Sequence, residues 1–354
     1  MQSGLLSTAL FGTAVATMLV GGGLADRYGA KRMVAIGLAF ALLGNLAFGA
    51  APSYAVLLAA KAIGGLGSGL AFLAGVRYIA NLYRGARSHV GQGLFGGGYP
   101  LGSALGVWSM APLAAAFGWR AAIVAATAFI AVVLVAWIAA PEVARSPASG
   151  SFVDAIRCGN CWLTSLEHAA GFGLGLAAGT WITVYLLREF ALPLELSGAF
   201  GSLLLVVAVF ARPLGGYLVA RGRVTTKSMM RLAQLAILLG LVGLAWPARP
   251  LSIALAGALL VGVGVGLPYA AVFNTAGASL PRAPGASQGL TAVGGTAGAL
   301  VLAPLLGYAI ERAGFGAAWA LLAALSLTAL ACTSALRGEE ELERDTVREM
   351  RAPT

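Results

Sequence analysis

The chain has 354 residues, of which 59% are apolar and only 10% are charged, and its mean hydropathy is +0.87. About a quarter of the residues of a soluble globular protein are charged, so this composition excludes a soluble domain. The formal net charge of +10 would suggest a nucleic-acid partner in a soluble chain. Here the basic residues stand in short connections between apolar runs, so we expect a lipid bilayer as partner and no nucleic acid.

Apolar segments follow one another along almost the whole chain. A helix needs about 20 residues to cross a bilayer core of roughly 30 Å, and helices are expected because backbone amides find no water in lipid. We therefore predict an all-α integral membrane protein with about eleven transmembrane helices. The predicted segments are 3–24, 33–51, 53–76, 90–112, 119–140, 161–187, 196–218, 229–247, 250–275, 286–309 and 314–336.

Two stretches about 195 positions apart are weak copies of one another. The run from Gly21 to Arg27 recurs from Gly215 to Arg221, and Gln92-Gly93-Leu94 recurs as Gln288-Gly289-Leu290. Two parallel repeats of apolar helices are typical of secondary transporters. We expect a five-helix bundle over residues 1–140, a linker over 141–160, a six-helix bundle over 161–336 and a charged tail over 337–354.

The sixth segment has no counterpart in the first repeat, and its partner would lie about thirty positions before Met1. We expect that the chain lacks the first helix of a twelve-helix protein, with a natural eleven-helix protein as the alternative. The first apolar run has no basic start, so a cleavable signal peptide is not expected. Most Lys and Arg residues fall on one set of connections, which places that set and the C-terminus in the cytoplasm.

The connection after the first segment carries a specific motif. Its sequence from Gly22 to Arg32 is GGLADRYGAKR, with Asp26 between two required glycines. This resembles the loop signature of the major facilitator superfamily, with Ala30 in place of the usual basic residue. Glycines allow close helix approach, and a carboxylate can meet a helix N-terminus or a cation in one state only. The resemblance implies gating roles for Gly22, Asp26, Arg27, Gly29, Lys31 and Arg32.

The second repeat carries a degenerate copy of this signature. Arg212-Pro213-Leu214-Gly215-Gly216 is followed by Arg221, with Ala220 where the acid would stand. The resemblance implies that Arg212, Gly215, Gly216 and Arg221 also belong to the gate.

Within the superfamily, the chain is most similar to the nitrate/nitrite-porter and cyanate-permease branch. This weaker similarity rests on Ala177–Trp181, on Arg212–Gly216 and on the sequence LPYAAVFN from Leu267 to Asn274. Nitrate itself is disfavoured, since those porters hold the anion between arginines of their second and eighth helices. Residues 3–24 contain no arginine, and we expect Arg212 near the cytoplasmic end of its segment.

Ionisable residues within membrane segments are costly and are therefore candidates for function. Lys61 lies about eight residues into the third segment, where it could meet an anionic substrate or contact a helix end. His168 suits proton coupling because its side chain titrates near neutral pH, and a core histidine is the alternative. Asn274 could line the pathway or cap a helix. These three are the candidate substrate-binding residues.

The resulting hypothesis is a secondary active transporter that moves a small solute, with an anion favoured, by alternating access coupled to a proton or another gradient. The alternatives are a multidrug or metabolite efflux antiporter, a membrane enzyme or receptor, and a truncated chain that transports nothing. No residue cluster points to catalysis. Cys158 and Cys161 have metal-site spacing but lack a second pair, so no metal or cofactor is expected. We expect a multi-pass monomer in a bacterial cytoplasmic membrane.

Overall fold

The computed structural model describes residues 2–145, 150–247 and 250–351, and these residues form helices and connections without a strand. The prediction of an all-α membrane protein is confirmed. The helices of the first half are α1 (Gln2–Tyr28), α2 (Ala30–Gly49), α3 (Tyr54–Leu82) and α4 (Ala86–Ile138). Those of the second half are α6 (Gly159–His168), the π-helical segment η1 (Ala169–Gly173), α7 (Leu174–Phe190), α8 (Leu194–Ala220), α9 (Thr226–Ala245), α10 (Leu251–Gly266), α11 (Tyr269–Ser279) and α12 (Pro284–Cys332).

Nine helical stretches of the described residues are long and apolar enough to cross a membrane. Two helices, α4 with 53 residues and α12 with 49, are longer than a single crossing requires. Each contains a glycine with a positive φ, 82° at Gly118 and 79° at Gly314, where the chain reverses direction. Only glycine adopts this conformation without strain. Divided at these glycines, the described residues provide the eleven spans that the sequence predicts.

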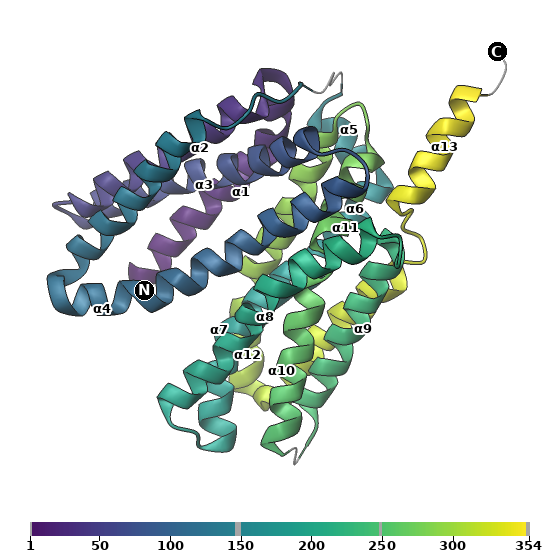
Figure 1. Ribbon diagram of the computed structural model, residues 1–354. Helices are drawn as coiled ribbons and strands as arrows, with labels where there is room; N and C mark the ends of the chain where they lie inside the picture. Colours follow the sequence, from purple (N-terminus) through teal and green to yellow (C-terminus); the bar gives the residue numbers. More distant parts are fainter. Residues whose placement is uncertain (1, 146–149, 248–249, 352–354) are drawn as a thin grey trace.

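The two halves pack against each other through α1 and α4 of the first half and α12 and α8 of the second. Figure 1 shows that they come together near α5, α6 and α11 and spread apart toward the bend of α4. The end where they meet carries the connections around residues 27–32 and 221–227. We call it the basic face.

Two close helix crossings between the halves occur at equivalent positions of the sequence repeat. Gly22 of α1 packs on the backbone of Gly285 at the start of α12, and Gly216 of α8 packs on the backbone of His89 at the start of α4. A side chain on either glycine would overlap the opposing backbone, so small residues are required at both crossings.

Two glutamines repeat this relation within the halves. Gln92 donates to the carbonyl of Val76 over 2.8 Å, and Gln288 donates to the carbonyl of Phe273 over 2.9 Å. These hydrogen bonds join α4 to α3 in the first half and α12 to α11 in the second half.

The linker between the halves contains the short helix α5 (Phe152–Arg157). Residues 146–149 of the predicted linker lie outside the described part of the chain. The Ser151 amide donates to the Asp154 carboxylate over 2.7 Å, which closes a capping box and lowers the pKa of Asp154. Ala155 is buried against Leu280 and Ala283 of the second half. The linker is therefore more structured than its composition indicates.

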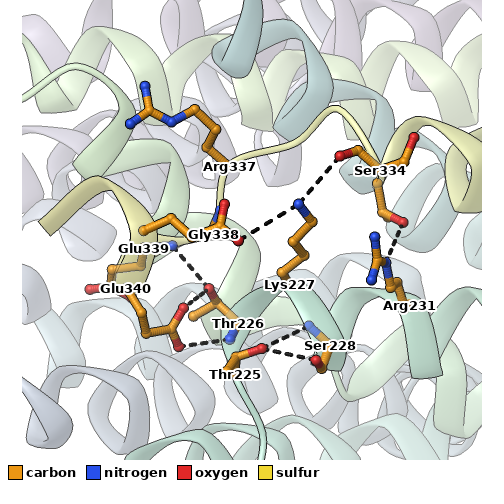
Figure 2. A network of polar contacts seen from close by, with 12 residues as sticks. Thr225, Thr226, Lys227, Ser228, Arg231, Ser334, Arg337, Gly338, Glu339 and Glu340 are labelled. Carbon is orange, nitrogen blue, oxygen red and sulfur yellow. Dashed lines mark hydrogen bonds and ion pairs between the residues drawn. The ribbon is translucent and has the colours of Figure 1, made fainter. Parts of the chain in front are cut away.

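The charged tail forms helix α13 (Glu339–Arg351), which extends away from the bundle (Figure 1). Its first turn is bound to the N-terminus of α9. The Glu340 carboxylate accepts from the Thr226 amide over 2.8 Å and from the Thr226 hydroxyl over 2.7 Å, and Lys227 donates to the carbonyl of Ser334 (Figure 2). A carboxylate beside the free amides of a helix N-terminus is favourable, and this contact fixes the start of the tail.

The close crossing of α1 and α12 gives a direct test of this packing. Gly22→Val should lower the temperature at which the detergent-purified protein unfolds, because overpacking of a tight contact typically costs about 1–3 kcal/mol. Gly23→Val is the matched control, since a Cβ at Gly23 meets nothing within 4 Å. Equal unfolding temperatures for the two variants would contradict the crossing.

Candidate functional site

A pocket with a volume of about 140 Å³ lies between the two halves. Helices α1, α3 and α4 form one wall, and η1, α8, α11 and α12 form the other, with His168 of α6 beside them. Most of the side chains that line it are apolar or aromatic. The lining residues are Leu10, Phe11, Ala14, Met18, Ser68, Phe72, Tyr99, His168, Phe172, Arg212, Tyr269 and Thr296.

Arg212 is the charged side chain among these described lining residues, and none of them is acidic. It is 3% exposed, and its Nη1 donates to the carbonyl of Gly96 on α4 over 2.5 Å. The guanidinium carbon lies 4.8 Å from the centre of the Tyr269 ring and 5.8 Å from that of Phe172. Its Nε has no hydrogen-bond partner within the described residues, nor has the Tyr269 hydroxyl.

The position of Arg212 corrects the sequence interpretation, which placed it near the end of its segment. Helix α8 continues to Ala220, so Arg212 lies eight residues, or about 12 Å, from the helix end. The side chain faces α4 and α11 and enters the pocket. One part of the argument against nitrate is therefore wrong. The other part holds for the described pocket, because α1 contributes Leu10, Phe11, Ala14 and Met18 and no arginine.

His168 also lies in the pocket, at the end of α6 where the π-helical segment η1 begins. Its ring stacks on Phe172 with a centroid distance of 5.2 Å and meets the edge of Phe273 at 5.0 Å. Single π-helical turns are frequent at functional sites, and here the turn begins directly after His168 and carries Phe172. Glu167 points the other way, into the second half, where it accepts from Gln234 over 3.0 Å.

Lys61 lies outside the pocket. Its Nζ stands over the ring of Phe48 on α2, 4.4 Å from the ring centre, and Phe48 in turn meets the edge of Trp119 at 5.9 Å. All three residues belong to the first half. The depth of Lys61 along α3 suggested a cavity position, but its side chain faces the neighbouring helix of its own half. In this conformation Lys61 is not among the residues that line the pocket.

Asn274 lies at the contact between the halves rather than in the pocket. Its side chain pairs with His89 Nδ1 over 2.9 Å and accepts from Ser88 Oγ over 3.2 Å. Both partners stand in the first turn of α4, so Asn274 of α11 joins the second half to the first at the basic face.

The loop signature forms the other part of this closed face. Asp26 Oδ1 accepts from Arg77 Nε of its own half over 2.7 Å, and Asp26 Oδ2 accepts from the amide of Gly285 at the N-terminus of α12 over 2.8 Å. Arg77 also reaches Gln288 of the second half over 3.4 Å. Asp26 and Arg77 are both buried. Asp26 therefore links a buried cation to a helix N-terminus across the interface.

The basic residues of the signature contact the first half and the start of the linker rather than the second half. Arg27 lies over the ring of Tyr28, Lys31 pairs with Glu142 over 3.1 Å, and Arg32 is exposed. Gly29 has φ 97° at the turn into α2, which explains the glycine at that position.

In the second copy, Gly215 packs on the carbonyl of Leu267, and Arg221 ends α8 over the ring of Tyr217. Ala220 supplies no carboxylate there. The tail provides one instead, because Glu339 pairs with His89 Nε2 over 3.1 Å. The contact between His89 and Glu339 was not predicted from the sequence. The signal for it was that Ala220 stands where the first copy of the signature has an acid. The pocket aromatics Tyr99, Phe172 and Tyr269 were also missed, although Pro268 marks a break in the helix beside the pocket.

Comparison with known proteins agrees with this architecture. The chain is 27% identical over 325 residues to the probable nitrate/nitrite antiporter NarK1 of Thermus thermophilus, covering 82% of this chain and 73% of that protein. It is 30% identical over 295 residues to the probable nitrate/nitrite transporter NarK2 of Mycobacterium tuberculosis, covering 80% and 72%.

Solved structures share the fold. The E. coli fucose:proton symporter FucP matches with a TM-score of 0.78 at 15% identity, covering 94% of this chain and 90% of that one. The human organic anion transporter MFSD10 matches with a TM-score of 0.76 at 18% identity, covering 94% and 83%. The family model described as Major Facilitator Superfamily matches residues 1–300. With its paired helical halves and its loop signature, the chain belongs to the major facilitator superfamily.

Proposed function

We propose that this transporter moves a small, singly charged anion through the pocket by alternating access. The observation that carries this proposal is Arg212, a buried cation with an unpartnered Nε and no acidic residue among the described residues around the pocket. A buried charge without a partner is costly, and an anionic substrate would supply the missing opposite charge. The relatives named as nitrate/nitrite transporters support an anion as well.

The contacts at the basic face support the assignment of this structure to one state of the transport cycle. Asp26 with Gly285, and His89 with Asn274 and Glu339, hold the halves together on one side of the pocket. By the positive-inside rule this face is cytoplasmic, and the structure then corresponds to the state closed toward the cytoplasm. Opening requires these contacts to break and the halves to rotate about the pocket.

Transport also requires a driving gradient and a defined membrane orientation. His168 is the ionisable neighbour of Arg212 in the pocket, and we assign it to coupling with a proton gradient. The protein acts as a multi-pass monomer in a cytoplasmic membrane, without a cofactor, and the C-terminal tail lies on the cytoplasmic side.

Arg212→Gln should reduce anion uptake by proteoliposomes. Removing one charge-assisted hydrogen bond costs roughly 1.5–3 kcal/mol, which corresponds to about ten- to a hundredfold in affinity. Arg212→Lys keeps the charge and should retain more uptake than Arg212→Gln. The control is Arg84→Gln, which removes an exposed arginine outside both the pocket and the loop signature. Unchanged uptake in Arg212→Gln, with nitrate and small carboxylates as probes, would contradict the assignment.

Asp26→Asn should shift the protein toward the state that is open at the basic face. The change weakens the contact to the Gly285 amide and leaves Arg77 without its buried counter-charge, and breaking such a pair typically costs about 3–5 kcal/mol. The readout is labelling of Ser88→Cys by a water-soluble maleimide, in a background with the native cysteines replaced by serine. Ser88 is 8% exposed in the closed state, so opening should accelerate its labelling.

The control for this experiment is Asp154→Asn. Asp154 pairs with Arg282 over 3.1 Å at the surface, where an ion pair contributes little. Equal labelling rates for Asp26→Asn and the parent protein would remove the gating role of Asp26.

A further inference from the structure

The side chains that line the pocket restrict the class of ligand further than the charge of Arg212 does. Phe11 and Phe72 of the first half and Phe172 and Tyr269 of the second contribute aromatic rings, and Leu10 and Met18 add aliphatic surface. An inorganic oxyanion has no apolar surface to place against such walls. A ligand with an apolar body would remove them from water, and each buried methylene raises affinity roughly fourfold.

The volume limits the size of that body. A cavity of about 150 Å³ lined by apolar side chains holds one benzene molecule, and this pocket measures about 140 Å³. The space therefore suits one aromatic ring or an aliphatic group of similar bulk. The pocket is too small for the multi-ring bodies of drug-like ligands, whose sites measure about 300–1,000 Å³.

The polar end of the pocket limits the charge of the ligand. One guanidinium is present, and its Nε and the neighbouring Tyr269 hydroxyl are donors without partners. A guanidinium matches the planar geometry of a carboxylate. A second negative charge would be buried without a permanent counter-charge, because Arg212 is the one Lys or Arg side chain among the described residues of the lining.

We propose that the transported anion is a monocarboxylate whose apolar body is about the size of one aromatic ring. This inference rests on the proposed function, since it takes Arg212 to be the group that binds the anion. It assigns the aromatic walls to the ligand body and Arg212 with Tyr269 to the carboxylate.

The test measures binding to the full-length purified protein by calorimetry, with acetate, butyrate, benzoate, nitrate, phthalate and benzamide as probes. Affinity should rise from acetate to butyrate to benzoate. Benzamide, which has the same ring without the charge, should bind at least tenfold more weakly than benzoate, and so should the dianion phthalate. Arg212→Gln should abolish the preference for benzoate over benzamide.

A substitution in the wall separates body from charge. Ala14 lines the pocket and is 3% exposed, so Ala14→Leu should reduce benzoate binding at least tenfold while acetate and nitrate binding stay within about threefold, as expected for a filled apolar site. Gly12→Leu on the same helix is the control, because a Cβ there meets nothing within 4 Å. The control should bind benzoate like the parent protein.

The results distinguish this inference from the proposed function. Binding of nitrate or acetate that depends on Arg212, with benzoate no tighter than acetate, would overturn the inference and leave an anion transporter. Benzamide that binds as well as benzoate, with no effect of Arg212→Gln, would overturn both. Absence of carboxylate binding up to millimolar concentration would also overturn the inference.

Discussion

A charged side chain that is removed from water needs a partner of opposite sign, and this protein meets that requirement differently for two buried arginines. Arg77 has Asp26, at 2.7 Å, together with Gln288. Arg212 has a carbonyl oxygen and two aromatic rings, which attract a cation but do not neutralise it. The paired arginine lies where the halves close, and the arginine without an acid lies where the pocket is. The distribution of counter-charge thus distinguishes the arginine of the interface from the arginine of the pocket.

The same helices carry both regions, which links the pocket to the gate. On α8, Arg212 of the pocket and Gly216 of the closed interface are four residues apart and so lie on one face. On α4, Gly96 accepts from Arg212, and His89 contacts Asn274 and Glu339. A ligand that changes the position of Arg212 therefore acts on the same helix segments that hold the basic face closed. Rigid helices with two packing arrangements can carry such coupling.

The pattern of apolar segments was sufficient to predict the fold, because helix length and lipid exclude other solutions. The copies of the glycine motif were also informative, since close crossings leave a direct mark in sequence. The orientation of single side chains was not predictable in this way. The side chain of Lys61 lies on a helix face that packs against Phe48 of its own half. The side chain of Arg212 lies on a helix face that borders the pocket. The role of Glu339 depends on a tail contact across the interface, for which no local pattern exists.

On the proposed function, Arg212 lacks an acidic partner because the substrate provides the negative charge. Unfolding temperatures of the purified parent protein, Arg212→Met and Arg77→Met, each with and without benzoate, test it most directly. Without ligand, we expect Arg212→Met to be at least as stable as the parent protein and Arg77→Met to be less stable. Benzoate should stabilise the parent protein but not Arg212→Met. A strongly destabilised Arg212→Met, together with a parent protein that neither benzoate nor nitrate stabilises, would show that Arg212 is a structural contact to α4.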